Sequence, residues 1–232
     1  MENERKFRHE LKYLINKRDM DSCLSRIRQF AEPDKHASGG VYSVRSLYYD
    51  DEYNSAYEDK ESGVPRRFKY RIRIYDMDES FISLEKKIKE GSFIKKESAV
   101  LSRAEYDLIR AGETGHLLKR SEKAAKEFAV SCRMDRLHPE VIVDYERIPF
   151  VYEHGNVRIT FDTNIRAVDD DDIFVRDDPS YSALPADLLV MEVKYTEFLP
   201  DIFRVVLPGE GSRLASSKYV MCEDVLRRMM LR

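Results

Sequence analysis

Residues 67–75 read RFKYRIRIY, a strict alternation of cations with aromatic and branched apolar residues. Successive side chains of an extended chain point to opposite faces, so Lys69, Arg71 and Arg73 share one face of a strand. The aromatic and β-branched residues between them suit the other face of a pleated sheet. The pattern therefore predicts a strand with three like charges in a row, which repel one another unless water or a polyanion offsets them.

Alternating patterns bounded by turn residues predict eight strands, at 6–15, 43–50, 66–75, 80–89, 92–98, 140–148, 157–163 and 188–195. The turn sequences DMDES and KEGS predict hairpins that join the third, fourth and fifth strands. Helical spacing predicts helices at 17–31, from the capping box of Ser102 and Glu105 to Gly112, at about 117–129, and over the C-terminal SSKYVMCEDVLRRMM. We therefore expect an α+β fold that is mostly antiparallel β. The helices are too few to cover both faces of an open eight-stranded sheet, so either one face meets water or the sheet closes.

The acidic run AVDDDDIFVRDDPS at 167–180 raises the question of a calcium loop. It lacks the central glycine and the closing glutamate that such a loop requires. The run therefore predicts a solvated connection between two elements.

The charged face of residues 67–75 is repeated on other predicted strands, often with a carboxylate two residues from a cation. These faces carry Arg8, Glu10 and Lys12; Glu85, Lys87 and Lys89; Arg158 and Asp162; and Glu192 and Lys194. If the sheet closes with these faces inward, it forms a tunnel lined by cations with a few carboxylates. Cations bind phosphate oxygens, and carboxylates hold a divalent metal that bridges such oxygens. The alternative is an amphipathic sheet whose charged face meets water, and the pattern alone does not choose between them.

Overall charge and composition restrict the classes of function. The chain has 40 Lys and Arg against 43 Asp and Glu, a net charge of −3, which argues against general nucleic-acid binding. No apolar run reaches the ~18 residues of a membrane span, and MENERKFRHE lacks the apolar core of a signal peptide. The three widely spaced cysteines fit reduced thiols, so we expect a cytoplasmic protein. GxxxxGK[ST], GxGxxG, HExxH and GxSxG motifs are absent, and the five histidines lack metal-ligand spacing.

The segments FRHELKYLI, SLYYD, YRIRIY, LEKKIK, YERIPF, VRITFDT, LLVMEVKY and SSKYV resemble, in order and spacing, the motifs of the VTC domain. That domain is the polyphosphate polymerase module of the vacuolar transporter chaperone complex, and bacteria carry single-domain relatives. It belongs to the triphosphate tunnel metalloenzyme superfamily, with CYTH-type triphosphatases as cousins. The resemblance spans about residues 5–228, so we expect one domain over 1–232. It implies a closed eight-stranded β tunnel flanked by about four helices, and chemistry on a triphosphate with Mn²⁺ or Mg²⁺.

The resemblance also implies roles for particular residues. The phosphate-binding and catalytic set is Lys12, Arg71, Arg73, Lys87, Arg147 and Arg158. The set that approaches the nucleotide is Tyr145, Lys96, Lys194, Ser217 and Lys218, with Lys95 left open as an alternative to Lys96. Glu192 matches the metal-binding glutamate, and Glu10 and Glu85 are further carboxylates for the metal.

Three functions fit these residues. A polymerase would transfer the ATP γ-phosphate to a polyphosphate end and would need no general base, since that end, with a pKa near ~6, is largely ionised at neutral pH. A triphosphatase of the same fold would need Glu10, Glu85 or Asp162 to deprotonate water. A polyphosphate or nucleotide sensor would keep the basic walls and need no metal. We expect ATP, triphosphate or polyphosphate as partners, no nucleic acid and no membrane span. We also expect no SPX-like regulatory part, and a separate membrane protein is a candidate partner.

Overall fold

The computed structural model describes residues 8–91, 93–196 and 198–231. Within these residues, the eight long strands are β1 (His9–Asn16), β3 (Tyr42–Asp50), β4 (Arg66–Tyr75), β5 (Ile82–Glu90), β6 (Phe93–Leu101), β7 (His138–Tyr152), β8 (Val157–Val168) and β10 (Leu188–Tyr195). All eight predicted strands are present, and those at 66–75 and 188–195 agree at both ends; residues 6, 7 and 92 lie outside the described residues. The short strands β2 (Glu32–Pro33) and β9 (Ser180–Ser182) were not predicted, because two or three residues are too few to establish an alternation.

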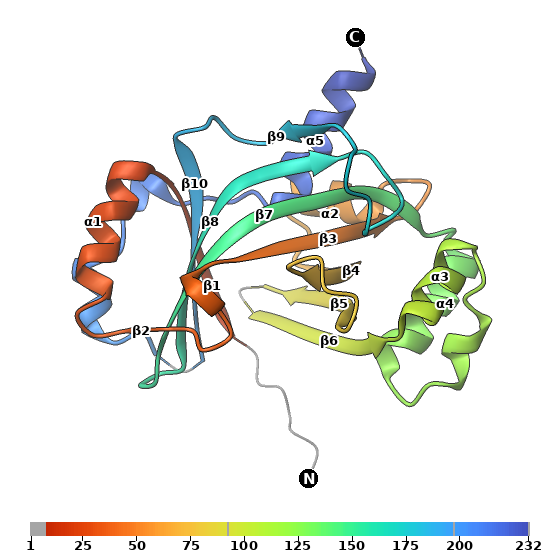
Figure 1. Cartoon of the computed structure of the whole chain (residues 1–232), viewed down its shortest axis with the longest axis horizontal. Coiled ribbons are helices and arrows are strands. Elements are labelled where there is room, and N and C mark those ends of the chain that lie inside the picture. Colours follow the sequence, from red (N-terminus) through yellow and green to blue (C-terminus); the bar gives the residue numbers. More distant parts are fainter. Residues whose placement is uncertain (1–7, 92, 197, 232) are drawn as a thin grey trace.

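The strands form one antiparallel sheet in the order β1-β10-β8-β7-β3-β4-β5-β6, with β2 paired to β7 and β9 paired to β8. The sheet bends strongly, as Figure 1 shows, yet it is not closed into a barrel. Its edge strands share one isolated bridge, in which the backbones of Arg8 and Ile94 exchange two hydrogen bonds of 3.3 Å. The prediction of a closed tunnel is therefore wrong, because among the described strands the ladder of β1 is formed with β10 and that of β6 with β5, and no ladder joins β1 to β6.

The described residues form five α-helices: α1 (Lys17–Ile27), α2 (Ser55–Glu61), α3 (Arg103–Arg110), α4 (Lys123–Met134) and α5 (Lys218–Met230). The capping box predicted for α3 is present, because the side chains of Ser102 and Glu105 cap each other's backbone N–H groups. The helix predicted at 17–31 ends earlier, at Ile27, and the one predicted at 117–129 is a 3₁₀ turn (Gly115–Lys119) followed by α4. Helix α2 was missed because it buries no residue and so has no apolar periodicity.

Helices α1, α3 and α4 cover the apolar faces of the strands from outside, with α3 and α4 beside β4–β6 and α1 at the opposite end (Figure 1). The apolar residues of β4, Tyr70, Ile72 and Ile74, pack in one cluster with Phe128 of α4. A second cluster joins β1, β8 and β10 to α1. A third joins α5 to Val44 and Tyr48 of β3 and to β7, on the face that carries the cations of β4, so α5 packs against the inner side of the sheet. The opposite, charged faces of the strands therefore lie on the inner side of the bent sheet.

The acidic run after β8 is not wholly solvated, contrary to the prediction. Ile173 is fully buried in the cluster beneath α3, and the hydroxyl of Tyr106 donates a 3.0 Å hydrogen bond to Asp172. Arg110 also pairs with Asp172 at 2.9 Å, which fastens the run to α3. Of the helices described, none has both the length and the apolarity needed to cross a membrane.

Candidate functional site

The cations of β4 point to the inner side of the sheet and are largely buried. The Arg71 side chain is 11% exposed and donates to Glu85 Oε2 at 2.8 and 2.5 Å and to the Tyr48 hydroxyl at 2.9 Å. Arg73 is 6% exposed and donates to Ser46 Oγ at 2.9 Å and to the Tyr145 hydroxyl at 3.3 Å. This burial rules out the simple amphipathic sheet whose charged face meets water.

Glu85 of β5 is the carboxylate that neutralises this part of the site. It also accepts a 2.5 Å hydrogen bond from Lys96 of β6, which lies opposite Lys87 in the strand register. Lys95 instead pairs with Glu97 at 2.9 Å, so Lys96 is the fifth-strand lysine that faces the site. Burial alone would raise the pKa of Glu85, but Arg71, Arg73 and Lys96 outweigh it and hold that pKa well below its usual range.

A second buried cluster lies where β7, β8, β10 and α5 meet. Arg147 donates to both oxygens of Asp162, at 2.6 and 2.8 Å, and Lys218 lies 2.6 Å from Asp162 Oδ2 and 2.7 Å from Glu192 Oε1. The Tyr145 ring lies beneath both cations, 5.2 Å from Arg147 and 5.1 Å from Lys218. Burial opposes charge on Asp162, but Arg147 and Lys218 outweigh it and lower the pKa of its carboxyl.

Lys194 links this cluster to Glu10 of β1. Its ammonium lies 3.1 Å from Glu192 Oε2 and 3.4 Å from Glu10 Oε1, since Glu10 and Lys194 are opposite each other in the β1–β10 register. Glu10 also pairs with Lys87 at 3.3 Å and with Lys12 at 3.5 Å. These three lysines overcome the effect of burial and lower the pKa of Glu10.

Arg158 lies at a different edge of the charged face. It contacts Asp34 at 2.8 Å and the Tyr42 hydroxyl at 3.0 Å. Tyr42, whose phenol interacts with both Arg158 and Arg147, links Arg158 to the second buried cluster. The predicted contact of Arg158 with phosphate is therefore less direct than that of the arginines of β4.

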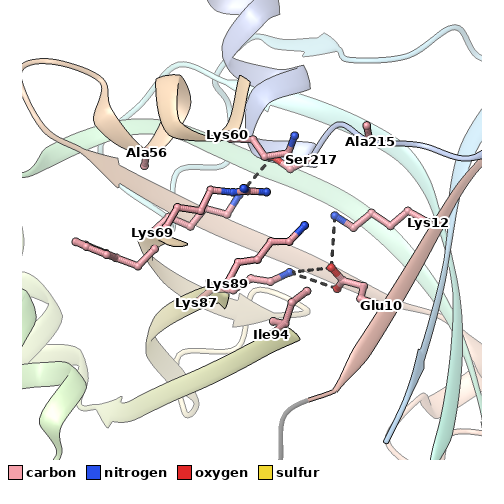
Figure 2. Close-up of a pocket in the computed structure, with 12 residues that line it drawn as sticks. Glu10, Lys12, Ala56, Lys60, Lys69, Lys87, Lys89, Ile94, Ala215 and Ser217 are labelled. Carbon is pink, nitrogen blue, oxygen red and sulfur yellow. Dashed lines mark hydrogen bonds and ion pairs between the residues drawn. The ribbon is translucent and has the colours of Figure 1, made fainter. Parts of the chain in front are cut away.

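A solvent-open pocket lies between β4, β5, β1 and α2, and its basic side chains converge on one space (Figure 2). Its lining includes Lys12, Lys60, Arg67, Lys69, Lys87 and Lys89, with Glu10 as its one carboxylate. Ser217 also lines the pocket, caps α5 and lies 3.4 Å from the Lys69 ammonium.

Lys60 and Arg67 of this lining were missed by the sequence analysis, which placed Lys89 on a charged strand face but gave it no role in the site. Arg67 continues the alternating face of Lys69, so the period-two pattern could have found it. Lys60 lies on α2, whose exposed sequence carried no signal.

The cation excess of the pocket changes the acidity of its residues. Burial, with Lys87, Lys12 and Arg71 nearby, lowers the pKa of Lys69 to about 7. Burial, with Lys12 and Lys194, lowers the pKa of Lys87 to about 8 despite the attraction of Glu10. Burial would raise the pKa of the Tyr48 phenol, but Arg71, Lys69 and Arg73 outweigh it and lower the value to about 7. All three shifts report a strongly positive potential in the site.

The carboxylates predicted to bind a metal do not form a preformed metal site. Carboxylate oxygens are suitable ligands for Mg²⁺ or Mn²⁺, but Glu192, Glu10 and Glu85 are each bonded to ammonium or guanidinium groups. Glu85 belongs to the β4–β6 cluster, away from the direct contacts of the other two. In the described ranges, no three His, Cys, Asp or Glu side chains are grouped to hold a metal ion.

The structure is thus a bent antiparallel sheet whose inner side carries a cation-lined pocket. The profile of the VTC domain matches residues 7–227. The chain therefore belongs to the VTC domain family. A search of curated proteins found no match.

Solved structures share the fold at low sequence identity. The Hippeastrum protein HpAC1, described as having a dominant triphosphatase activity, has a TM-score of 0.55 at 11% identity, covering 95% of this chain and 96% of that one. A candidate adenylate cyclase from Bacillus halodurans has a TM-score of 0.54 at 15% identity, over 88% and 94% of the two chains. The PH1012 protein from Pyrococcus horikoshii OT3 has a TM-score of 0.51 at 9% identity, over 93% and 98%. At these identities the likeness concerns the fold alone.

Proposed function

We propose that this chain is a polyphosphate polymerase, which transfers the terminal phosphate of ATP to a growing polyphosphate chain. The observation that carries the proposal is the pocket, in which six lysines and arginines surround one carboxylate. Phosphoryl transfer requires mainly that the phosphates be positioned and their charge be stabilised. Membership of the VTC family supports the same function.

The proposal assigns the residues to three groups. Lys12, Arg71, Arg73, Lys87, Arg147 and Arg158 bind the reacting phosphates, and Tyr145, Lys96, Lys194, Ser217 and Lys218 border the nucleotide. Glu192, Glu10 and Glu85 hold these cations in place. Because the carboxylates are already paired, we propose that Mn²⁺ or Mg²⁺ enters as a companion of ATP. ATP as the donor agrees with a cytoplasmic location.

The acidity of the carboxylates favours transfer over hydrolysis. A triphosphatase must deprotonate water, but the pKa values of Glu10, Glu85 and Asp162 are all lowered and each carboxylate is held by cations. Such groups are poor general bases. A terminal phosphate with a pKa near ~6 is already largely ionised at neutral pH and needs none. The second candidate is nevertheless a triphosphatase, since HpAC1 combines this fold with that activity.

The two activities are separated by their products. Purified protein incubated with ATP and Mn²⁺ should release ADP and form chains that a polyacrylamide gel resolves, with little free phosphate. Stoichiometric free phosphate without chains would establish the triphosphatase instead. If neither chains nor free phosphate form but the protein binds tripolyphosphate, the protein is a sensor rather than an enzyme.

We expect anion binding to be coupled to proton uptake by Lys69 and Lys87. A bound polyphosphate favours their charged forms and raises their lowered pKa values, so affinity should fall as pH rises through 7 and 8. The folding stability of the free protein should change with pH in the opposite direction to the affinity. Its free energy of unfolding rises between pH 7 and 8, because the unfolded chain, with normal lysine pKa values, binds more protons than the native state.

Calorimetry of tripolyphosphate binding in two buffers with different ionisation enthalpies measures this uptake at pH 8. A double variant, Lys69→Arg with Lys87→Arg, keeps both charges but cannot titrate in this range. It should take up fewer protons than the parent protein. Equal uptake by both proteins would show that groups other than Lys69 and Lys87 take up the protons.

A further inference from the structure

The outer part of the site contains cations placed directly opposite one another. In the β4–β5 register Arg67 lies opposite Lys89, and Lys69 lies opposite Lys87; in the β5–β6 register Lys87 lies opposite Lys96. Side chains opposite each other in an antiparallel pair have Cβ atoms about 4.5–5.5 Å apart, and like charges there are destabilising. The first two of these pairs follow each other on one face of β4 and β5 and form a row of repulsive contacts, which Lys96 extends to β6.

This row ends abruptly one pair further in. Arg71 of β4 lies opposite Glu85 of β5, and the two form a buried ion pair. Farther inside, Arg147 and Lys218 are likewise matched by Asp162 and Glu192. The inner site is therefore neutralised by its own carboxylates. In the outer row Lys87 pairs with Glu10, whereas Arg67, Lys69 and Lys89 form no ion pair with a carboxylate of the described residues.

Lys60 adds a further cation to the outer site from the opposite wall. It extends from α2 into the same pocket as Arg67 and Lys89, as Figure 2 shows for the two lysines. Burial and its neighbours Arg67, Lys12 and Lys89 lower the pKa of Lys60, and burial with Arg67 and Lys12 lowers that of Lys89. Over the described parts of the chain, Lys60, Arg67 and Lys89 form no ion pair with a carboxylate.

We infer that Lys60, Arg67 and Lys89 form an outer subsite that selects inorganic polyphosphate chains longer than a triphosphate. The inference rests on the proposed function, because it takes the inner arginines as the place of the reacting phosphates. From Arg71 to Arg67 is four residues of strand, about 13 Å at ~3.3 Å per residue. A ligand that contacts both must be extended and charged along its length. A linear polyphosphate carries charge on every unit and meets both conditions.

The subsite predicts that chain length decides the effect of a mutation. The test is a triple variant, Lys60→Gln, Arg67→Gln and Lys89→Gln, titrated with tripolyphosphate and with size-fractionated long-chain polyphosphate. Affinity for the long chain should fall by roughly 30- to 100-fold, the scale of losing three partly exposed ion-pair contacts. Affinity for tripolyphosphate should stay within about threefold, and the salt dependence of long-chain binding should become shallower by about three charges.

A control variant removes the same charge elsewhere: Arg28→Gln, Lys119→Gln and Lys126→Gln, three exposed residues outside the pocket. It should bind both ligands like the parent protein. The subsite variant should melt no lower than the parent, because its substitutions remove repulsion between opposite residues.

Other outcomes overturn the inference in distinguishable ways. Equal loss for both ligands would mean that the outer cations belong to the triphosphate site, and no loss for either would mean that they bind no chain. A single-stranded oligonucleotide that binds as tightly as polyphosphate, with the same loss in the variant, would assign the subsite to nucleic acid. If the parent protein binds neither phosphate ligand, the proposed function fails and this inference fails with it.

Discussion

Replacing Asp162 with asparagine should lower the free energy of unfolding by about 3–5 kcal/mol, the usual cost of removing one partner from a buried ion pair. Asp162 is fully buried and accepts from Arg147 and Lys218 together. Asparagine keeps the shape but leaves these two buried cations with less opposing charge. Glu192 also contacts Lys218 and offsets only part of the loss.

Urea denaturation at pH 7 measures this effect. The matched control is Asp201→Asn, a side chain 86% exposed that pairs only with Arg204 on the surface, and it should change stability by less than about 0.5 kcal/mol. Tripolyphosphate should stabilise the Asp162 variant more than the parent protein, because its oxygens supply the missing negative charge. A loss below about 1 kcal/mol would contradict a buried, structurally required ion pair.

Arg71→Gln should reduce ADP release from ATP by about 10²- to 10³-fold, the scale of losing one preorganised charge at a transferring phosphoryl group. Arg71 is held by Glu85 and Tyr48 on the inner side of the sheet, where the proposal places the reacting phosphate. Arg71→Lys should restore only part of the rate, because an ammonium lacks the planar, forked donors of arginine.

The control for Arg71 lies on the same strand. Arg66 is 86% exposed on the opposite face and pairs with Glu90, so Arg66→Gln should leave turnover within about twofold of the parent. Both variants are compared at saturating ATP and Mn²⁺ after circular dichroism has shown that they are folded. Turnover of Arg71→Gln within a few-fold of the parent protein would remove Arg71 from the reacting site.

The strands, and the face that the charged residues of each strand share, could be predicted because period-two alternation is a local property. Ile72 and Ile74 must face an apolar layer, so Arg71 and Arg73 must face the other way. The capping box of Ser102 and Glu105 is equally local, and it located the start of α3.

Partners that depend on register could not be predicted in this way. The contact of Lys218 with Asp162 requires α5 to pack across β8 and β10, which no local pattern specifies. The neutralisation of Glu192 and Glu85 by neighbouring cations, and therefore the lack of a preformed metal site, follows from the same long-range packing. Closure failed as a prediction for a related reason, since alternation does not state how far β1 and β6 run side by side. Lys60 was missed because α2 has no buried face.

The carboxylates of the inner site make ligand binding an exchange reaction. Glu85 already forms ion pairs with Arg71 and Lys96. An incoming anion must therefore bind these cations more strongly than the carboxylate that it displaces. A singly charged anion, such as acetate, would replace one carboxylate by another at no gain. An oligophosphate carries several charged oxygens on one backbone, so it binds the two cations more strongly than the Glu85 carboxylate does. If phosphates bind here as proposed, the protein's own acidic residues favour anions of high charge density over abundant, weakly charged ones.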